Sequence, residues 1–275
     1  MQKIKDHFGI KLDLSVKDFT KNDRLYLIDL LGKHKIVFFK NTKLTYDELL
    51  EFSNIFSNPW SNKSENELAG NGEKTSTHPY SNHITRVSNK NLGVLRDWYV
   101  PWHSDVSHKP WDSPGGTLPF RVLYAVTLPP DEKTHTSWFD QEYVYNHCPV
   151  ELKNLVENIQ AEYKAIYNTA WAGNTMPFTL TNPITNKKSF SVSDLFFEKF
   201  KDFDYDTSKD IINQLLKIAT MDQNVLDHVW EPDDLCIYNN FNTAHQRSRI
   251  TSIYERTLWR VTLQIPELVP FELRV

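Results

Sequence analysis

The sequence predicts a mainly β fold with flanking helices, in which a double-stranded β-helix, or jelly roll, forms the core. Three observations lead to this prediction. Short β-like runs recur from residue 84 to the C-terminus, turn-rich stretches separate them, and a few helical stretches lie before and between them. This combination is typical of a double-sheet jelly roll decorated by helices. A chain of 275 residues without internal repeats fits one domain of this kind, spanning 1–275.

The chain ahead of residue 84 is predicted to contain two helices and a strand. Residues Asp23 to Leu31 carry apolar side chains at helical spacing, and Gly32 is expected to end this helix. The apolar run from Ile36 to Phe39 predicts a short buried strand. Thr45 and Glu48 have the spacing of a capping box, so a second helix is expected to begin there.

Residues 58–83 are rich in Asn, Ser, Gly, Pro and His and lack periodicity, which predicts a long loop that can act as a lid. Helices are predicted at about 149–163 and about 208–219. The β-like runs after residue 83 are Ile84 to Val87, Arg121 to Val126, Thr136 to Phe139, Leu235 to Tyr238 and Arg256 to Gln264.

The composition of the chain limits the kinds of molecule that we expect it to bind. The net charge is −4 and Lys and Arg are not clustered, so a nucleic-acid partner is not expected. No window approaches the roughly 18 apolar residues of a membrane span, so no membrane partner is expected either. The two cysteines, Cys148 and Cys236, form no CxxC motif and are too few for a disulfide framework. We therefore expect a cytoplasmic protein that acts on a small molecule, and the sequence leaves open whether copies form a homo-oligomer.

A candidate metal site begins at His103. In Trp102-His103-Ser104-Asp105, an imidazole and a carboxylate lie two residues apart. On an extended backbone both side chains point to one face and can bind one cation. Two histidines and one carboxylate leave adjacent positions free on the metal, which is typical of non-haem Fe(II) oxygenases. The HxD pattern alone is common by chance, so a second histidine is needed.

His245 is the candidate for that third ligand, and Arg256 and Arg260 follow it. Because side chains alternate along a strand, Arg256, Leu258 and Arg260 should share one face. Two guanidinium groups that point into an interior need anions. At about 3.3 Å per residue they lie roughly 13 Å apart, far enough for two different carboxylates, or for one ligand and one structural acidic side chain.

Together these residues resemble the taurine dioxygenase-like family of iron(II)/2-oxoglutarate-dependent dioxygenases. In that family an HxD pair precedes a distal His that is followed by arginines eleven and fifteen positions later. His103, Asp105, His245, Arg256 and Arg260 reproduce both intervals. The resemblance covers nearly the whole chain, because LLGKHKIVFFKNTKLTYDELLEFSNIF is similar to the N-terminal segment of the family and PWHSDVSHKP to its metal-binding loop.

The resemblance implies a cofactor, a co-substrate and a reaction. His103, Asp105 and His245 would bind Fe(II), and Arg256 would pair with the distal carboxylate of 2-oxoglutarate. Oxidative decarboxylation of 2-oxoglutarate by O2 to succinate and CO2 would drive oxidation of a C–H bond, with hydroxylation as the default and desaturation or oxidative cyclisation as alternatives. Asp105 excludes the related halogenases, which have a small residue at that position.

Two further roles follow from the same resemblance. Arg260 would face the primary substrate, which is then expected to be anionic or amino-acid-like, or it would help to hold the co-substrate. LPPDEKTHTSWFD is similar to the stretch of the family that carries a 2-oxoglutarate-binding Thr, and Thr136 is the candidate. Thr134 is the competitor, because this loop is one residue longer than usual and lacks the usual glycines.

The substrate pocket has four further candidates. His78, Tyr80 and His83 lie in the loop predicted as a lid, and Tyr99 lies four residues before His103. A single His or Tyr in a polar loop is more often solvated than part of a pocket. Two other functions remain open for the metal ligands: a zinc-dependent hydrolase with a metal-bound hydroxide, and a metal-binding jelly roll without catalysis.

Overall fold

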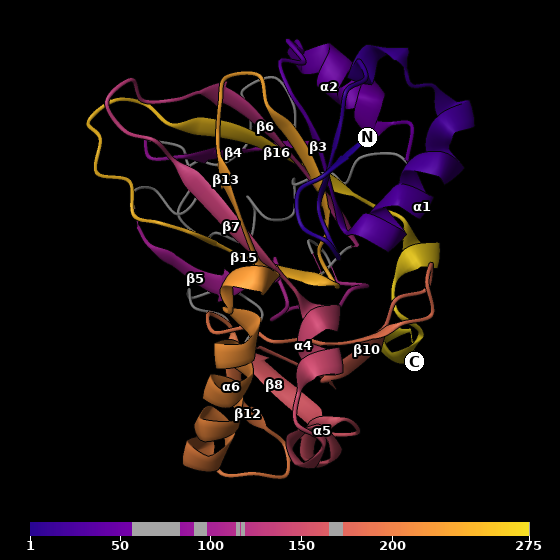
Figure 1. Cartoon of the computed structure of the whole chain (residues 1–275), viewed down its shortest axis with the longest axis vertical. Helices are drawn as coiled ribbons and strands as arrows, with labels where there is room; N and C mark the ends of the chain where they lie inside the picture. Colours follow the sequence, from indigo (N-terminus) through magenta and orange to yellow (C-terminus); the bar gives the residue numbers. More distant parts are fainter. Residues whose placement is uncertain (57–82, 91–97, 114–115, 117–118, 165–172, 275) are drawn as a thin grey trace.

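The structure is a computed structural model that describes residues 1–56, 83–90, 98–113, 116, 119–164 and 173–274. Its centre consists of two β-sheets (Figure 1). The larger sheet contains, in spatial order, β1 (Gln2–Lys3), β2 (Ile10–Leu12), β3 (Ile36–Phe39), β14 (Leu235–Asn239), β6 (Phe120–Thr127), β16 (Thr257–Leu263) and β4 (Ile84–Ser88). The smaller sheet contains β13 (Val225–Val229), β7 (His135–Asp140), β15 (Thr243–Arg247) and β5 (Val100–His103).

The two sheets pack against each other through a shared apolar cluster. Phe38, Leu123 and Tyr238 come from the larger sheet, and Trp138 and Leu226 come from the smaller one. All neighbouring strands are antiparallel except β2 and β3. Packing of two mostly antiparallel sheets face to face buries one side of each and confirms the predicted jelly-roll core.

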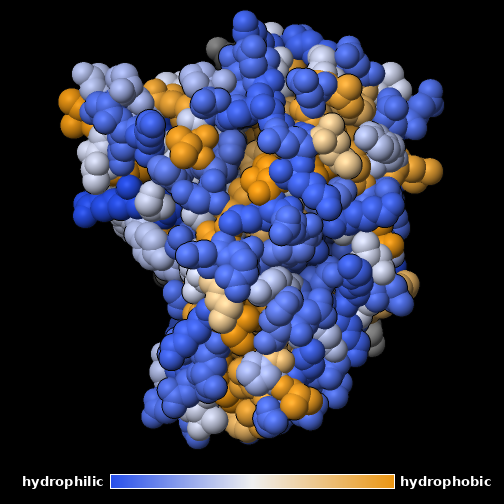
Figure 2. Space-filling model, in the orientation of Figure 1, coloured by the Kyte–Doolittle hydropathy of each residue, from blue (hydrophilic) through white to orange (hydrophobic). Residues whose placement is uncertain are grey.

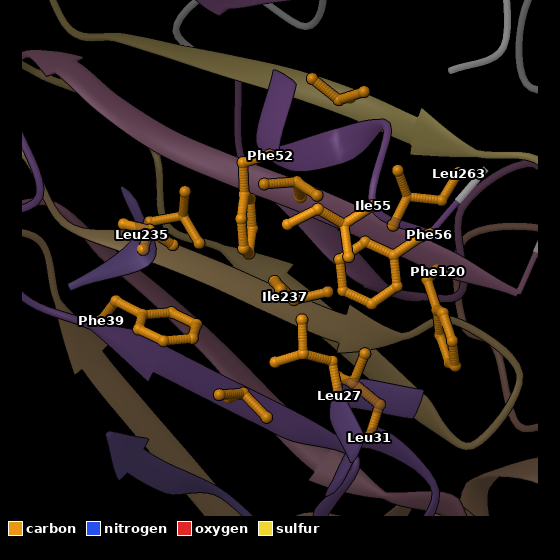
Figure 3. Packing of buried hydrophobic residues seen from close by; sticks show 14 of the residues in the cluster. Leu27, Leu31, Phe39, Phe52, Ile55, Phe56, Phe120, Leu235, Ile237 and Leu263 are labelled. Atoms are coloured by element: carbon orange, nitrogen blue, oxygen red, sulfur yellow. The ribbon is translucent and has the colours of Figure 1, made fainter. Parts of the chain in front are cut away.

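Helices α1 (Arg24–His34) and α2 (Tyr46–Ser53) cover the other face of the larger sheet. Figure 3 shows their side chains, including Leu27 and Phe52, packed onto Phe39 and Ile237 of the sheet. The predicted capping box is present, because Thr45 Oγ1 accepts a hydrogen bond from the Glu48 backbone N–H and Glu48 Oε2 accepts one from that of Thr45. This cap satisfies two N–H groups at the start of α2.

A second apolar cluster joins the smaller sheet to the lower part of the molecule in Figure 1. This part contains helices α4 (Gln141–His147), α5 (Val150–Val156) and α6 (Tyr205–Ala219). Strands β12 (Phe197–Phe200), β8 (Gln160–Lys164) and β9 (Gly173–Pro177) form a small sheet here, and β10 (Thr179–Thr181) pairs with β11 (Lys188–Phe190).

Gly32 does not end the first helix, contrary to the prediction. A Cβ at this position would lie 2.4 Å from Ile184 Cγ2, so the glycine allows close packing between helix and loop. The helix continues to His34 and ends at Lys35, which adopts a φ of 63°. The Lys35 ammonium is buried and forms ion pairs of 3.0 Å with both Asp140 and Glu142. The side chain of Lys35 is thus held in the interior at the position where the helix ends.

The helix predicted at about 149–163 is wrong over its second half. The structure ends α5 at Val156 and places Gln160–Lys164 in a strand between β9 and β12. Alternation of buried and exposed residues in this stretch suits a strand, and pairing on both sides overrides the weak helical preference. The other predicted strands and α6 are present within a few residues of their expected bounds.

Most of the predicted lid, residues 58–82, lies outside the described residues. Among the described helices, none has both the length and the apolar character needed to cross a membrane. On the face shown in Figure 2, hydrophilic side chains predominate and apolar ones occur in scattered groups.

Candidate metal centre

The structure brings His103, Asp105 and His245 together between the two sheets. One ligand atom from each of these buried residues lies within 4.8 Å of those of the other two. His103 ends β5 and His245 is in the middle of β15, and the two residues lie directly opposite each other in the pairing of these strands. Their ring centroids are 4.2 Å apart. The strand register therefore sets the distance between the two imidazoles.

The backbone around His103 orients its ring. His103 Nδ1 donates a hydrogen bond of 2.7 Å to the carbonyl oxygen of Pro101. A proton on Nδ1 leaves the lone pair of Nε2 available to a metal, as is usual for histidine ligands with a carbonyl partner. Nε2 lies 3.7 Å from Asp105 Oδ1, so a cation placed between them can contact both atoms.

Asp105 is held by Asn240, which follows β14. The Asp105 N–H donates to Asn240 Oδ1 at 2.7 Å, and Asn240 Nδ2 donates to the Asp105 carbonyl at 3.0 Å. Between the two ligands, the Ser104 hydroxyl points the other way and donates to the Thr243 carbonyl at 2.9 Å. The residues in the HxD pattern thus alternate as predicted, with both ligands on the cavity side.

The Asp105 carboxylate accepts hydrogen bonds from two side chains and lies near a third. Tyr238 donates its hydroxyl to Oδ2 at 2.6 Å, and Arg260 Nη1 donates to Oδ1 at 3.2 Å. Arg121 Nε lies 3.4 Å from Oδ2. Burial alone would raise the pKa of Asp105, but the charges of the nearby Arg260 and Arg121 guanidinium groups lower it well below its ordinary value. The carboxylate is therefore ionised and ready to bind a cation.

His245 is neutral over the ordinary pH range. Burial, together with the nearby His103, lowers the pKa of His245 to about 3. Its Nδ1 has no hydrogen-bond partner among the residues that the structure describes. Two imidazoles and one carboxylate, all buried, form a donor set that fits a divalent transition metal.

The candidate ligands open into a cavity with an empty volume of about 470 Å³. Strands of both sheets line it, and its apolar wall consists of Val87, Val100, Leu123 and Leu258. Its polar lining outside the metal ligands consists of Thr136, Tyr238, Arg247, Arg256 and Arg260. The sequence prediction that Arg256, Leu258 and Arg260 share one face agrees with this lining.

Arg256 is a buried cation that lacks an anion within the described residues. Its side chain is almost fully buried, and Nε and Nη1 have no hydrogen-bond partner there. Burial, reinforced by the charge of Arg247, lowers the pKa of Arg256 to about 9. Asn89 fixes its backbone by accepting a hydrogen bond of 2.8 Å from the Arg256 N–H. A desolvated guanidinium in a cavity is a good partner for a carboxylate ligand.

Of the two threonine candidates, Thr136 lines the cavity and Thr134 does not. Thr136 Oγ1 accepts a hydrogen bond of 2.8 Å from Trp230 Nε1, which orients the hydroxyl proton away from the indole. The backbone carbonyl of Thr134 accepts from the Trp230 N–H at 3.0 Å. The geometry thus favours Thr136 as a contact of a ligand in the cavity.

Of the four further candidates for the substrate pocket, the two that the structure describes do not line this cavity. Tyr99 is 53% exposed and donates its hydroxyl to Gln246 Oε1, and neither Tyr99 nor His83 belongs to the cavity lining. His78 and Tyr80 lie outside the described residues. A role for any of the four in substrate binding remains a prediction.

Four side chains of the site were not predicted from the sequence: Arg121, Tyr238, Asn240 and Arg247. Tyr238 and Arg121 lie in strands that are buried on both faces, where periodicity does not identify a special position. Arg121 could nevertheless have been recognised, because it lies in the apolar run FRVLYAVT and a buried arginine needs an anionic partner. Arg247 could also have been predicted, because it lies two positions after His245 and alternation places both side chains on the same face of the strand.

Comparisons with known proteins show the family to which the chain belongs. The sequence profile of the family described as "Taurine catabolism dioxygenase TauD, TfdA family" matches residues 2–262. Pentalenolactone F synthase of Streptomyces arenae is 24% identical over 243 residues, which cover 79% of this chain and 78% of the relative. An alkylsulfatase of Acinetobacter baylyi is 23% identical over 279 residues, covering 94% and 79% of the two chains.

The crystal structure of AAD-2 in complex with Mn(II) and N-oxalylglycine superposes with a TM-score of 0.77 at 19% identity, covering 95% of each chain. A likeness at this identity shows that the fold is shared. The family match covers almost the whole chain and therefore decides its membership. The chain belongs to the taurine catabolism dioxygenase TauD, TfdA family and is thus an oxidoreductase of the 2-oxoglutarate-dependent dioxygenase class.

Proposed function

We propose that this protein is an Fe(II)- and 2-oxoglutarate-dependent dioxygenase that oxidises a C–H bond of a small molecule and releases succinate and CO2. One observation carries the proposal. A buried set of two histidines and a carboxylate shares a cavity with Arg256, a buried guanidinium without an anionic partner among the described residues. A metal site and a carboxylate site in one cavity suit a co-substrate that is both a chelator and a dicarboxylate.

Each residue of the site has its own proposed role. His103, Asp105 and His245 would hold Fe(II), which when bound supplies the redox chemistry with O2 and 2-oxoglutarate. Arg256 and Thr136 would hold the distal carboxylate of 2-oxoglutarate. The apolar wall of the cavity excludes water and leaves space in which one carbon of the substrate is held near the metal. Hydroxylation is the default outcome, and desaturation or cyclisation would use the same residues.

Arg256 also separates this proposal from its rivals. A zinc-dependent hydrolase needs the three ligands and a metal-bound water, but it has no use for a buried guanidinium that faces the same cavity. A function in metal binding without catalysis likewise does not explain the partly desolvated cavity or the buried Arg256. Both rivals would use the same three ligands, so a chemical test is needed in addition to this argument.

Anaerobic addition of Fe(II) and then 2-oxoglutarate is the decisive experiment. The proposed enzyme should develop a weak visible charge-transfer absorption as the 2-oxo acid chelates the metal, and admission of O2 should release succinate. A protein that stays colourless and releases no succinate under these conditions would refute the proposal. Substitution of Zn(II) for Fe(II) serves as the control, since it supports neither the colour nor succinate release.

We further propose that the primary substrate carries an anionic group or is amino-acid-like, and that Arg260 contributes to binding it. Arg260 lines the cavity beside the metal ligands, with 14% of its side chain exposed. The structure also pairs Arg260 with Asp105, so an acidic side chain of the protein, the alternative that the sequence left open, contacts this arginine. Taurine and the alkyl sulfates for which relatives are named both carry a sulfur-centred anion. This supports an anionic substrate without identifying it.

Arg260→Gln and Arg121→Gln form a matched pair for this test, because both arginines lie beside Asp105 but only Arg260 lines the cavity. Small carboxylates, sulfonates and amino acids would first be screened for stimulation of succinate release by the wild type. We expect Arg260→Gln to weaken the response to the active compound by roughly tenfold or more, as for loss of a charged hydrogen bond. Equal losses in both variants, traced to Fe(II) affinity, would instead assign Arg260 to positioning Asp105.

A further inference from the structure

Tyr238 is a fully buried side chain that contacts two of the three candidate metal ligands, and the proposed function gives it no role. Its hydroxyl donates a hydrogen bond to Asp105 Oδ2, and its ring centroid lies 5.1 Å from that of His245. Tyr238 belongs to β14 of the larger sheet, whereas His245 belongs to β15 of the smaller one. The tyrosine therefore connects the candidate ligands across the interface between the two sheets.

The two carboxylate oxygens of Asp105 have different surroundings. Oδ1 lies 3.7 Å from His103 Nε2 and accepts a hydrogen bond from Arg260 Nη1 at 3.2 Å. Oδ2 accepts the Tyr238 hydroxyl at 2.6 Å and lies 3.4 Å from Arg121 Nε. Each carboxylate oxygen has two lone pairs, so Oδ1 can bind a cation as well as Arg260. The oxygen beside the second ligand is thus the one that is placed to face a metal.

Strand register explains why donors gather at Oδ2. Tyr238 and Arg121 lie directly opposite each other in the pairing of β14 with β6, so their side chains share one face of the sheet. Asn240, two residues after Tyr238, holds the backbone N–H and carbonyl of Asp105. Because the backbone of Asp105 is held separately, loss of the Tyr238 hydroxyl should release the carboxylate without displacing the residue.

We propose that Tyr238 is a positioning residue, which holds Oδ2 of Asp105 and thereby leaves Oδ1 to bind the metal. The proposal rests on the proposed function and adds a residue that acts on the metal through Asp105. A carboxylate that offers one oxygen occupies one coordination position and keeps the others open for a chelating 2-oxo acid. A carboxylate that is free to turn would no longer be held in this orientation.

Tyr238→Phe tests the proposal, because it removes the hydroxyl and keeps the ring that packs against His245 and Trp138. The change has two opposed effects on metal affinity: Asp105 becomes a stronger donor, but its carboxylate rotates more freely. Hydrogen-bond partners of metal ligands typically contribute about 10- to 100-fold to metal affinity, so the loss of orientation should dominate. We expect anaerobic titration with Fe(II) to give a dissociation constant about tenfold higher than that of the wild type.

The charge-transfer absorption of the Fe(II)- and 2-oxoglutarate-loaded protein provides a second measurement, which needs no turnover. The transition moves an electron from the metal to the 2-oxo acid, so a carboxylate that donates more strongly to the metal lowers its energy. Tyr238→Phe should therefore shift the band to longer wavelength. Incorporation of 3-fluorotyrosine at position 238 should shift the band to shorter wavelength, because its more acidic hydroxyl donates a stronger hydrogen bond to Asp105.

Tyr163→Phe is the matched control. Tyr163 is also buried and donates its hydroxyl to the Ser191 carbonyl at 2.7 Å, but it does not line the cavity. Both Phe variants lose one buried hydrogen bond, so their melting temperatures without metal should fall by similar amounts. Only Tyr238→Phe should change the Fe(II) affinity and the absorption band.

Fe(II) affinity equal to or tighter than that of the wild type, or an unshifted band, in Tyr238→Phe would overturn the proposal. Equal changes in Tyr163→Phe would do the same, since they would show a general effect on the fold. If Tyr238→Phe does not fold, the direction of the band shift in the 3-fluorotyrosine protein decides. Wild-type protein that binds no Fe(II), or that shows no absorption with 2-oxoglutarate, would instead refute the proposed function, which is a different outcome.

Discussion

Replacement of His245 by Ala is expected to abolish succinate formation and to leave the fold intact. The variant removes one of two imidazoles in a three-residue donor set, and the two remaining ligands cannot hold Fe(II) in the geometry that the strand pairing imposes. Fe(II) affinity, measured by anaerobic titration, and succinate release with 2-oxoglutarate should fall together. The melting temperature without added metal should change little, since a neutral ring is lost at the edge of a cavity.

His135→Ala is the matched control for His245→Ala. His135 lies on β7 of the same sheet, but its ring is hydrogen-bonded to Asp227 at the surface and does not line the cavity. This variant should retain Fe(II) affinity and activity. Full iron-dependent succinate production by the His245→Ala protein would contradict the assignment of the metal site.

Replacement of Arg256 by Gln should produce the second largest effect, a severe loss of 2-oxoglutarate binding. Removal of one partner of a buried charge pair typically costs about 2 to 5 kcal/mol. At 1.4 kcal/mol per factor of ten, this corresponds to a roughly 30- to 4,000-fold rise in the dissociation constant. Gln also removes the repulsion between Arg247 and Arg256, so we expect the loss to lie toward the lower end of this range.

Arg86→Gln tests whether the effect is specific to Arg256. Arg86 forms an ion pair of 2.6 Å with Glu255, the residue that precedes Arg256, and it does not line the cavity. Disturbance of the backbone at this point should therefore appear in both variants, whereas loss of the carboxylate partner should appear only in Arg256→Gln. An unchanged affinity of Arg256→Gln for 2-oxoglutarate would rule out the proposed role.

The parts of the fold that could be predicted from the sequence are those that depend on residues close together in the chain. The Thr45 and Glu48 capping box and the strand from Ile36 to Phe39 depend on residues within a few positions of each other. Helix α4 was not predicted because it has only seven residues, and such short helices are marginal without tertiary contacts. Its buried Val144 packs into the cluster under the smaller sheet, and that contact has no local signature.

In the candidate site, too, only the residues that are close together in the sequence could be grouped in advance. Alternation along an extended chain was sufficient to group His103 with Asp105, and Arg256 with Arg260, because each pair lies on one strand or strand end. Arg247 and Tyr238 reach the site from strands whose order in the sheets the local sequence does not specify. The pairing of Arg260 with Asp105 depends on bringing β16 next to the end of β5, so the sequence left open only an acidic partner of unknown position.

The opposition of His103 and His245 across two paired strands has a consequence for conformational stability. The two residues are 142 positions apart (245 − 103), yet one cation would link their strands. Such a link exists only in the native chain, so metal binding stabilises it by mass action, by about 2.7 kcal/mol when the free metal is 100-fold above its dissociation constant. The cation would act as a removable cross-link that closes a long loop, and the integrity of the smaller sheet would then depend on the supply of metal.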